Sequence, residues 1–165
     1  MAALRGGAYG IPFQPVCGMW GSDLLEQNPD FYKVMECPWT GEKVVCVRSL
    51  RPDYSIIHVQ EADIYGNARI LGPNYQDVLL SRASGHVILT TERIVGTYRM
   101  QEEPKLTAIP HILVDAVVEL PGGAKHGICY PEYLTVDFDL HKEYQKAVKS
   151  GEVPKFAEKM LEGRL

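Results

Sequence analysis

Residues 54–67 read Tyr-Ser-Ile-Ile-His-Val-Gln-Glu-Ala-Asp-Ile-Tyr-Gly-Asn, an apolar run that passes into polar side chains and a Gly-Asn turn. Its first six residues are mostly β-branched or aromatic, which predicts a β-strand over Tyr54–Val59. Polar groups at the end of a buried strand are typical of the ligand site of an open α/β sheet. This stretch therefore indicates both the class of fold and the place where a functional site is expected.

The surrounding sequence predicts further strands and one clear helix. A helix is expected over residues 74–84, because apolar side chains recur there at intervals of three and four. Runs of β-branched, aromatic or alternating apolar residues predict strands over residues 31–35, 43–47, 86–91 and 112–120. We therefore expect an α/β fold with a mainly parallel sheet and flanking helices. The short connections between the early strands leave an α+β description open.

The run Ile112–Leu120 is nearly all apolar around Asp115, which is typical of a strand covered on both faces. Beyond it, amphipathic spacing predicts two helices at the end of the chain. We treat residues 1–165 as a single, apparently partial domain, with a core segment at 1–135 and C-terminal helices at 136–165. Met1–Ala8 is similar to the last turns of a helix that Gly6, Gly7 and Gly10 close, and no strand precedes it. That opening favours a fragment, a split gene or a shortened gene model.

Composition and charge exclude several classes of protein. The sequence has 17 basic and 21 acidic side chains and a formal charge of -4, whereas a general nucleic-acid binder needs a basic face. The apolar runs are too short to cross a membrane, and the N-terminus lacks the pattern of a signal peptide, so we expect a cytoplasmic protein. The four cysteines and five histidines show no zinc-type spacing, so no metal site is expected.

Glu61 and Asp63 are the first candidates for chemistry. Two carboxylates two residues apart lie on the same side of an extended chain, where they could act as acid and base or supply a nucleophile. The simpler interpretation is that Asp63 caps the turn at Gly66-Asn67 and that Glu61 is solvated or lies at an interface.

Two further strand positions carry a functional and a structural interpretation. His58 lies inside an apolar strand, where a histidine more often has both ring nitrogens satisfied by neighbours than it binds a ligand. Glu92 follows the strand predicted over residues 86–91 and could contact substrate or lie at an interface, although a local pair with Arg93 explains it as easily. The catalytic candidates are therefore Glu61 and Glu92, and the substrate-binding candidates are His58, Gln60, Asn67 and Gln76.

Six blocks of the sequence share one pattern: Ala3–Phe13, Pro38–Val45, Asp53–Asn67, Gly72–Asp77, Val87–Val95 and Ile109–Ala124. In this order they resemble the A subunits of family I coenzyme A transferases, and glutaconate-type A subunits most of all. The resemblance implies the coenzyme A transferase (NagB/RpiA-like) fold, and it places this chain in the C-terminal half of such a subunit. Glu61 departs from the pattern, because glutaconate-type sequences often have an uncharged residue there.

The resemblance also implies an activity and partners. Family members move coenzyme A between an acyl-CoA and a small (di)carboxylic acid through a glutamyl-CoA intermediate, with coenzyme A as substrate and no bound cofactor. The nucleophilic glutamate belongs to a B-type partner subunit, so we expect it on another chain, and a further chain could supply the N-terminal half. Relatives of this fold that hydrolyse or decarboxylate a carboxyacyl-CoA, and a non-catalytic structural subunit, are the alternatives.

Overall fold

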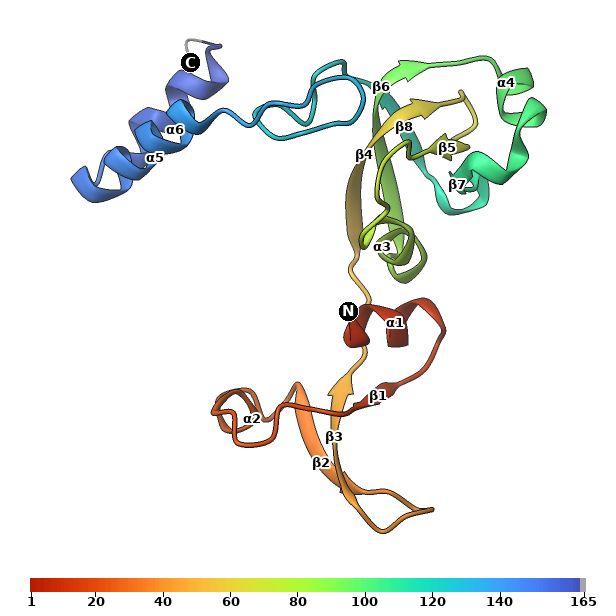
Figure 1. The fold of residues 1–165 in the computed structure, drawn as a ribbon, viewed down its shortest axis with the longest axis vertical. Helices are drawn as coiled ribbons and strands as arrows, with labels where there is room; N and C mark the ends of the chain where they lie inside the picture. Colours follow the sequence, from red (N-terminus) through yellow and green to blue (C-terminus); the bar gives the residue numbers. More distant parts are fainter. Residues whose placement is uncertain (164–165) are drawn as a thin grey trace. The chain divides into compact units, whose positions relative to one another are not determined.

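The computed structural model describes residues 1–163, which divide into two compact units. The first unit is Met1–Gly123 and contains both β-sheets, and the second begins at Ala124 and contains helices α5 and α6 (Figure 1). Among the described residues, no helix is long and apolar enough to cross a membrane. The organisation of residues 1–165 as a single domain stays a prediction.

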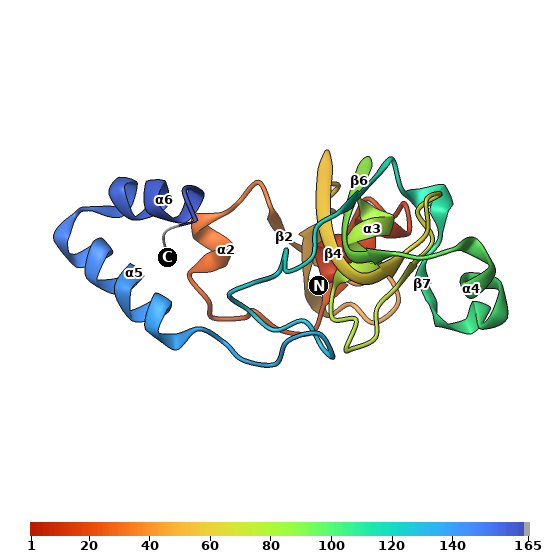
Figure 2. The ribbon, with the colours of Figure 1, turned by 90° about the horizontal axis from the view of Figure 1, so that it is seen from above.

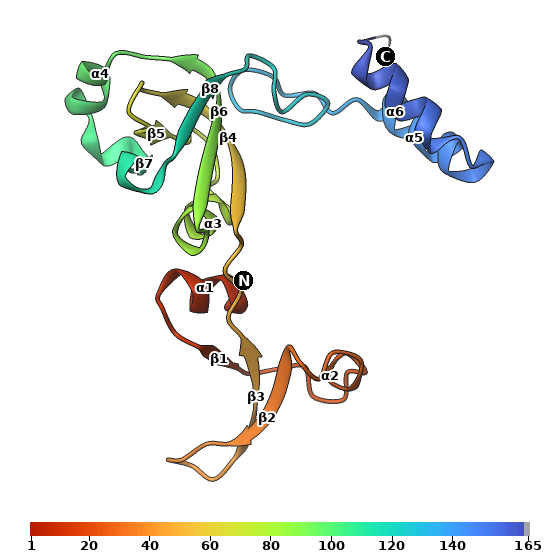
Figure 3. The same cartoon turned by 180° about the vertical axis from the view of Figure 1, so that it is seen from behind.

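The larger sheet has five strands in the order β7-β5-β4-β6-β8 (Figures 1 and 3). These strands are β4 (Tyr54–Ala62), β5 (Ala68–Arg69), β6 (His86–Ile94), β7 (Thr107–Ile109) and β8 (Ala116–Glu119). Strands β4, β6 and β8 run parallel to one another, whereas β5 is antiparallel to both β4 and β7. With its flanking helices, this mainly parallel sheet confirms the predicted α/β class.

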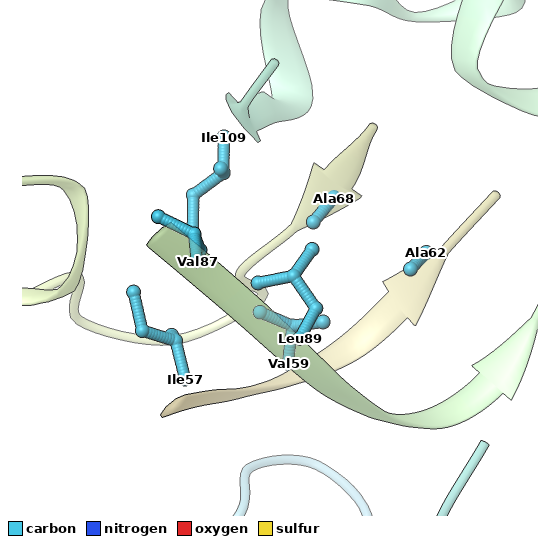
Figure 4. Packing of buried hydrophobic residues seen from close by; sticks show 7 residues of the cluster. All are labelled: Ile57, Val59, Ala62, Ala68, Val87, Leu89 and Ile109. Carbon is cyan, nitrogen blue, oxygen red and sulfur yellow. The ribbon is translucent and has the colours of Figure 1, made fainter. Parts of the chain in front are cut away.

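The main hydrophobic core lies on one face of this sheet. Side chains alternate along β4, so that Ile57 and Val59 point inward while Tyr54 and Ile56 point outward. Figure 4 shows the buried cluster, whose members are Ile57, Val59, Ala62, Ala68, Val87, Leu89 and Ile109. Helix α3 (Asp77–Ala83) packs Leu80 against this cluster, so the predicted helix over residues 74–84 covers the core face.

The prediction for residues 112–120 is wrong in two respects. His111–Leu113 form a short 3-10 turn (η2), so the strand β8 begins only at Ala116. The strand is not covered on both faces, because Val118 on its outward face is 47% exposed. Its apolarity reflects one inward residue, Val117, which packs on the core, and outward residues that stay accessible.

A smaller antiparallel sheet precedes the larger one along the chain. Its strands are β1 (Phe13–Val16), β2 (Tyr32–Glu36) and β3 (Lys43–Arg48), in the order β1-β3-β2, and the short helix α2 (Leu24–Gln27) connects β1 and β2. Helix α1 (Ala2–Ala8) lies against the chain that leaves β3. The expectation that Gly6 and Gly7 close this helix is wrong, because both lie inside it. They permit close packing instead, since a Cβ on Gly7 would overlap the Leu50 carbonyl group.

Beyond β6 the chain forms helix α4 (Thr97–Glu102) and a 3-10 turn, η1 (Pro104–Leu106), before β7. The second unit ends in the two predicted helices, α5 (Phe138–Ser150) and α6 (Val153–Leu161), which run side by side (Figures 1 and 2). Asp137 caps α5, because its Oδ1 accepts a 2.8 Å hydrogen bond from the Leu140 N–H. The rings of Tyr144 and Phe156 join the two helices at 5.5 Å.

Candidate functional site

Polar side chains gather where the parallel strands β4 and β6 end. Glu61 on β4 is level with Arg93 on β6 in the strand register, and Asp63 follows directly after β4. In open α/β sheets, ligands bind beyond the carboxyl ends of parallel strands. The region around Glu61 is therefore the candidate functional site.

Glu61 is completely buried and is surrounded by three arginines. Its Oε1 accepts hydrogen bonds from Arg93 Nε at 3.2 Å and Nη2 at 3.1 Å, and from Arg99 Nη2 at 2.8 Å. Its Oε2 accepts from Arg99 Nε at 3.1 Å and lies 3.6 Å from Arg69 Nη1. The expectation that Glu61 is solvated or interfacial is therefore wrong for this chain, because its carboxylate joins β4, β5, β6 and α4.

The electrostatics of this cluster keep Glu61 ionised. Burial by itself would raise the pKa of the Glu61 carboxyl, but hydrogen bonds and charge from Arg99 and Arg93 outweigh it and hold that pKa below its usual range. A general acid must carry a proton near neutral pH, and an attacking carboxylate needs an accessible lone pair. Glu61 has neither property, so the arrangement fits an organising role for it.

The sequence does not predict that these three arginines are partners of Glu61. Arg69 is buried, and its Nη2 donates to the carbonyl oxygens of Arg99 and Glu103. Arg93 and Arg99 expose 42% and 49% of their side chains. An alignment of the two strands would have predicted one of these partners. A parallel pairing of the strands that begin at Tyr54 and His86 brings Arg93 level with Glu61.

Asp63 shapes the turn after β4, as predicted. Its Oδ1 accepts from the N–H groups of Tyr65 at 3.0 Å and Asn67 at 2.9 Å, and its Oδ2 accepts from Asn67 Nδ2 at 2.8 Å. Burial alone would raise the pKa of Asp63, but the hydrogen bonds from Asn67 and Tyr65 outweigh it and lower that pKa. Asn67 in turn accepts from the His111 N–H at 3.1 Å. Asp63 and Asn67 therefore fix the connections between strands.

His58 and Glu92 form a second polar group, on the opposite face of the sheet from Glu61. His58 Nδ1 lies 2.9 Å from Thr90 Oγ1, and its Nε2 lies 2.8 Å from Glu92 Oε1. This confirms that both ring nitrogens are satisfied by neighbours. The Gly122 N–H donates to both oxygens of Glu92, at 3.0 and 2.9 Å.

The expected local pair between Glu92 and Arg93 does not form. Successive residues of a strand point to opposite faces, so Glu92 turns toward His58 while Arg93 turns toward Glu61. A carboxylate and its neighbouring arginine in a strand are therefore poor candidates for a mutual ion pair.

The two glutamines lie in different settings. Gln60 is buried, and its Oε1 accepts a 3.1 Å hydrogen bond from the Leu71 N–H. Gln76 is exposed at the residue before α3, where its carbonyl accepts from the Leu80 N–H. Among the described contacts, Gln76 does not join the hydrogen-bond networks of Glu61, Asp63 or His58. Roles for both glutamines in substrate binding remain predictions.

Comparison with known proteins identifies relatives along most of the chain. A family model described as "Coenzyme A transferase" matches residues 1–120. The A subunit of glutaconate CoA-transferase from Acidaminococcus fermentans is 37% identical over 162 residues, which cover 88% of this chain and 50% of the relative. The crystal structure of glutaconate coenzyme A-transferase from that organism matches with a TM-score of 0.84 at 31% identity, over 98% of this chain and 54% of that chain.

Two other relatives carry different names. A crystal structure of a variant of the decarboxylase AibA/AibB matches with a TM-score of 0.80 at 30% identity, over 97% of this chain and 57% of that chain. The cholesterol ring-cleaving hydrolase IpdA subunit from Mycobacterium tuberculosis is 29% identical over 156 residues, 89% of this chain and 53% of the relative. The chain spans about half the length of these relatives.

Proposed function

Because this chain belongs to the coenzyme A transferase family, we propose that it is part of an A-type subunit of an enzyme that transfers coenzyme A. The donor would be an acyl-CoA and the acceptor a small (di)carboxylic acid. The likeness to glutaconate CoA-transferase in sequence and in fold supports this reaction over others. Coenzyme A is then a substrate, and a B-type subunit is the expected partner.

In the reaction that we propose, a glutamate carboxylate attacks the thioester carbonyl and the coenzyme A thiolate leaves. The thiolate then attacks the glutamyl carbonyl of the resulting anhydride, which releases the first acid and leaves a glutamyl-CoA thioester. The acceptor acid reverses these steps and takes the coenzyme A. This chemistry needs one accessible carboxylate.

The observation that supports a nucleophile on a partner subunit is that both candidate carboxylates are held in contacts within this chain. Glu61 is inaccessible and holds guanidinium groups, and Glu92, whose side chain is 8% exposed, contacts His58 and the Gly122 N–H. Neither can reach a thioester without breaking those contacts. We therefore assign the nucleophile to the B-type partner, and the half of the subunit that this chain does not span to another polypeptide segment.

Hydrolysis or decarboxylation of a carboxyacyl-CoA is the second candidate. The likeness to the decarboxylase AibA/AibB and to the hydrolase IpdA subunit favours it, because both share this stretch of fold or sequence. The three reactions differ in the step after substrate binding: transfer needs an acceptor acid, hydrolysis needs only water, and decarboxylation releases carbon dioxide. A structural subunit without catalytic residues is the third candidate. It is supported by the same observation, that the carboxylates of Glu61 and Glu92 are held in contacts within the chain.

The test is reconstitution with the partner. The chain is co-expressed with the N-terminal half and with a B-type subunit. Acyl-CoA is then supplied with and without an acceptor such as glutarate. We expect transfer only in the complete complex and only with the acceptor. Free coenzyme A or carbon dioxide released without the acceptor would favour the second candidate. Transfer by this chain alone, lost in Glu61→Gln, would overturn the assignment of the nucleophile to the partner.

A further inference from the structure

Strand β4 is paired unequally on its two sides. Toward β6 the pairing extends from Tyr54 to Ala62, whereas on the other side β5 pairs only with Glu61 and Ala62. Over residues 54–59 the described part of the chain therefore supplies a partner strand on one side alone, and Figures 1 and 3 show only β6 along this stretch. We call the other side of residues 54–59 the open edge of β4.

The hydrogen bonds between β4 and β6 show which backbone groups face the open edge. The His86 N–H, at the start of β6, donates to the Asp53 carbonyl at 2.9 Å. Bonding alternates along a parallel pair, so Ser55 and every second residue after it direct their N–H and C=O groups to β6. The residues between them direct these groups to the open edge, and they are positions 54, 56 and 58. Such a row of backbone donors and acceptors is a template for a further strand.

The open edge has none of the side chains that usually keep an edge strand single. Residues 54–59 read Tyr-Ser-Ile-Ile-His-Val, with no lysine or proline, and an apolar edge of this kind associates with other strands. Ile57 and Val59 lie in the core on one face, and Tyr54 and Ile56 are exposed on the other. A strand beside them would therefore contact apolar side chains on both faces, as buried strands of parallel sheets do.

Ser55 provides an independent observation at the same place. Its side chain is buried, and its Oγ has no hydrogen-bond partner among the residues that the structure describes. A buried hydroxyl without a partner is destabilising, and serine or threonine hydroxyls on neighbouring strands commonly bond to each other. A strand added beside β4 could supply the polar group that Ser55 needs.

We propose that a β-strand of another polypeptide segment pairs with the open edge of β4 and extends the five-stranded sheet. The segment is the one that supplies the part of an A-type subunit that this chain does not span. This chain matches glutaconate coenzyme A-transferase over 98% of its own length but over only 54% of that chain, so a large part of the relative lies outside this fold. The added strand is nearly all apolar and has one hydroxyl or amide side chain beside Ser55. The identity of the partner rests on the proposed function, whereas the open edge does not.

The experiment compares the full chain alone with the full chain co-expressed with the part of the Acidaminococcus fermentans A subunit that it does not match. Hydrogen exchange of backbone amides is followed residue by residue by NMR. In the chain alone, we expect the amides at positions 54, 56 and 58 to exchange at least about tenfold faster than those at positions 55, 57 and 59. In the complex, exchange at positions 54, 56 and 58 should slow by at least about tenfold.

A proline variant tests the edge in a second way. Ile56→Pro removes an N–H that faces the open edge and none that bonds to β6. Ile56→Ala loses the same side chain but keeps this N–H, so it is the matched control. We expect Ile56→Pro to weaken assembly at least about tenfold more than Ile56→Ala, as measured by the yield of complex in size-exclusion chromatography. The exchange measurement on the unsubstituted chain decides the matter if the proline variant does not fold.

Three outcomes would overturn the proposal. They are failure of the two polypeptides to assemble, fast exchange at positions 54, 56 and 58 within the complex, and slow exchange at these positions in the chain alone. In the last case, a dimer in size-exclusion chromatography would assign the open edge to a second copy of this chain. Transfer activity is judged separately: a protected edge without activity contradicts only the proposed function, and activity with an unprotected edge contradicts only the strand pairing.

Discussion

His58 on β4 and Glu92 on β6 bring an imidazole nitrogen and a carboxylate oxygen to 2.8 Å across two parallel strands, and the carboxylate also accepts the Gly122 N–H. The ring is held again through Thr90, and a Cβ on Gly123 would lie 3.0 Å from it. Residues 122–123 therefore rest on the histidine, and the pair fastens the chain after β8 to the middle of the sheet.

Replacing Glu92 with glutamine should weaken its contacts with His58 and with the Gly122 N–H. The amide keeps the size of the side chain but loses the charge that strengthens its bonds to His58 and to the Gly122 N–H. We expect Glu92→Gln to lower the free energy of unfolding by about 1–3 kcal/mol in urea denaturation. Glu26→Gln, at an exposed position of α2, is the matched control and should change it by less than about 0.5 kcal/mol. Equal effects in both variants would show that the contacts of Glu92 add nothing.

The pH dependence of the free energy of unfolding should show how much ionised Glu61 stabilises the fold. Its pKa is lowered in the folded chain, so as pH falls the unfolded chain takes up a proton first, below about pH 4.3. The stabilisation is thus complete above that pH and is lost as pH falls toward the folded pKa. We expect urea midpoints measured from pH 7 to pH 3 to fall more steeply in the unsubstituted chain than in Glu61→Gln. Parallel profiles would contradict this.

The same substitution should be strongly destabilising at neutral pH. Glu61→Gln leaves Arg69 buried opposite an amide, and breaking a buried ion pair in this way costs about 3–5 kcal/mol. The measurement is the free energy of unfolding at pH 7. Glu158→Gln, on the exposed surface of α6, removes the same charge and is expected to change little.

Gly66 should tolerate no side chain. Its φ is +101°, and a Cβ there would lie 2.8 Å from the Val114 Cβ. Gly66→Ala should therefore destabilise the chain by more than about 1 kcal/mol, the cost of the backbone conformation alone. Gly41→Ala is the control, because its φ is +73° but its nearest atom would be 3.8 Å away. Adding Val114→Ala to Gly66→Ala should recover part of the loss, and no recovery would rule out the steric cause.

The two adjacent isoleucines of β4 test which face of the sheet is buried in the core. Ile57 is 3% exposed and lies in the core, whereas Ile56 is 69% exposed. Ile57→Ala should cost about 2–5 kcal/mol of unfolding free energy, and Ile56→Ala less than about 1 kcal/mol. Chemical denaturation of both variants gives the comparison, and similar losses would mean that Ile56 is covered in solution.

The sequence predicts the parts of this fold that depend on local pattern. The periodicity at Tyr54–Val59 and at residues 86–91 locates β4 and β6, and the hydrogen-bonding habits of Asp63 predict its turn. Apolarity alone misleads at Ile112–Leu120, because an edge strand and a central one can have the same composition.

The site could be predicted only in part, because its partners are distant in sequence. Arg93 and Arg99 lie 32 and 38 residues from Glu61, and no local pattern links them. Their meeting depends on the register of two strands and on the position of α4. The burial of Glu61 depends on the same long-range arrangement, so its charge by itself predicts a solvated residue.

The alternation along β4 bears on how faithfully the chain folds. Isoleucines occupy both faces of this strand, so a slip of one residue against β6 would still place apolar side chains in the core. Such a slip would, however, turn Glu61 away from Arg93 and would separate His58 from Thr90 and Glu92. A buried charge without its partner raises the free energy of the misaligned state. The polar residues thus stabilise one register of β4 against β6. The hydrophobic residues beside them do not distinguish that register from the shifted one.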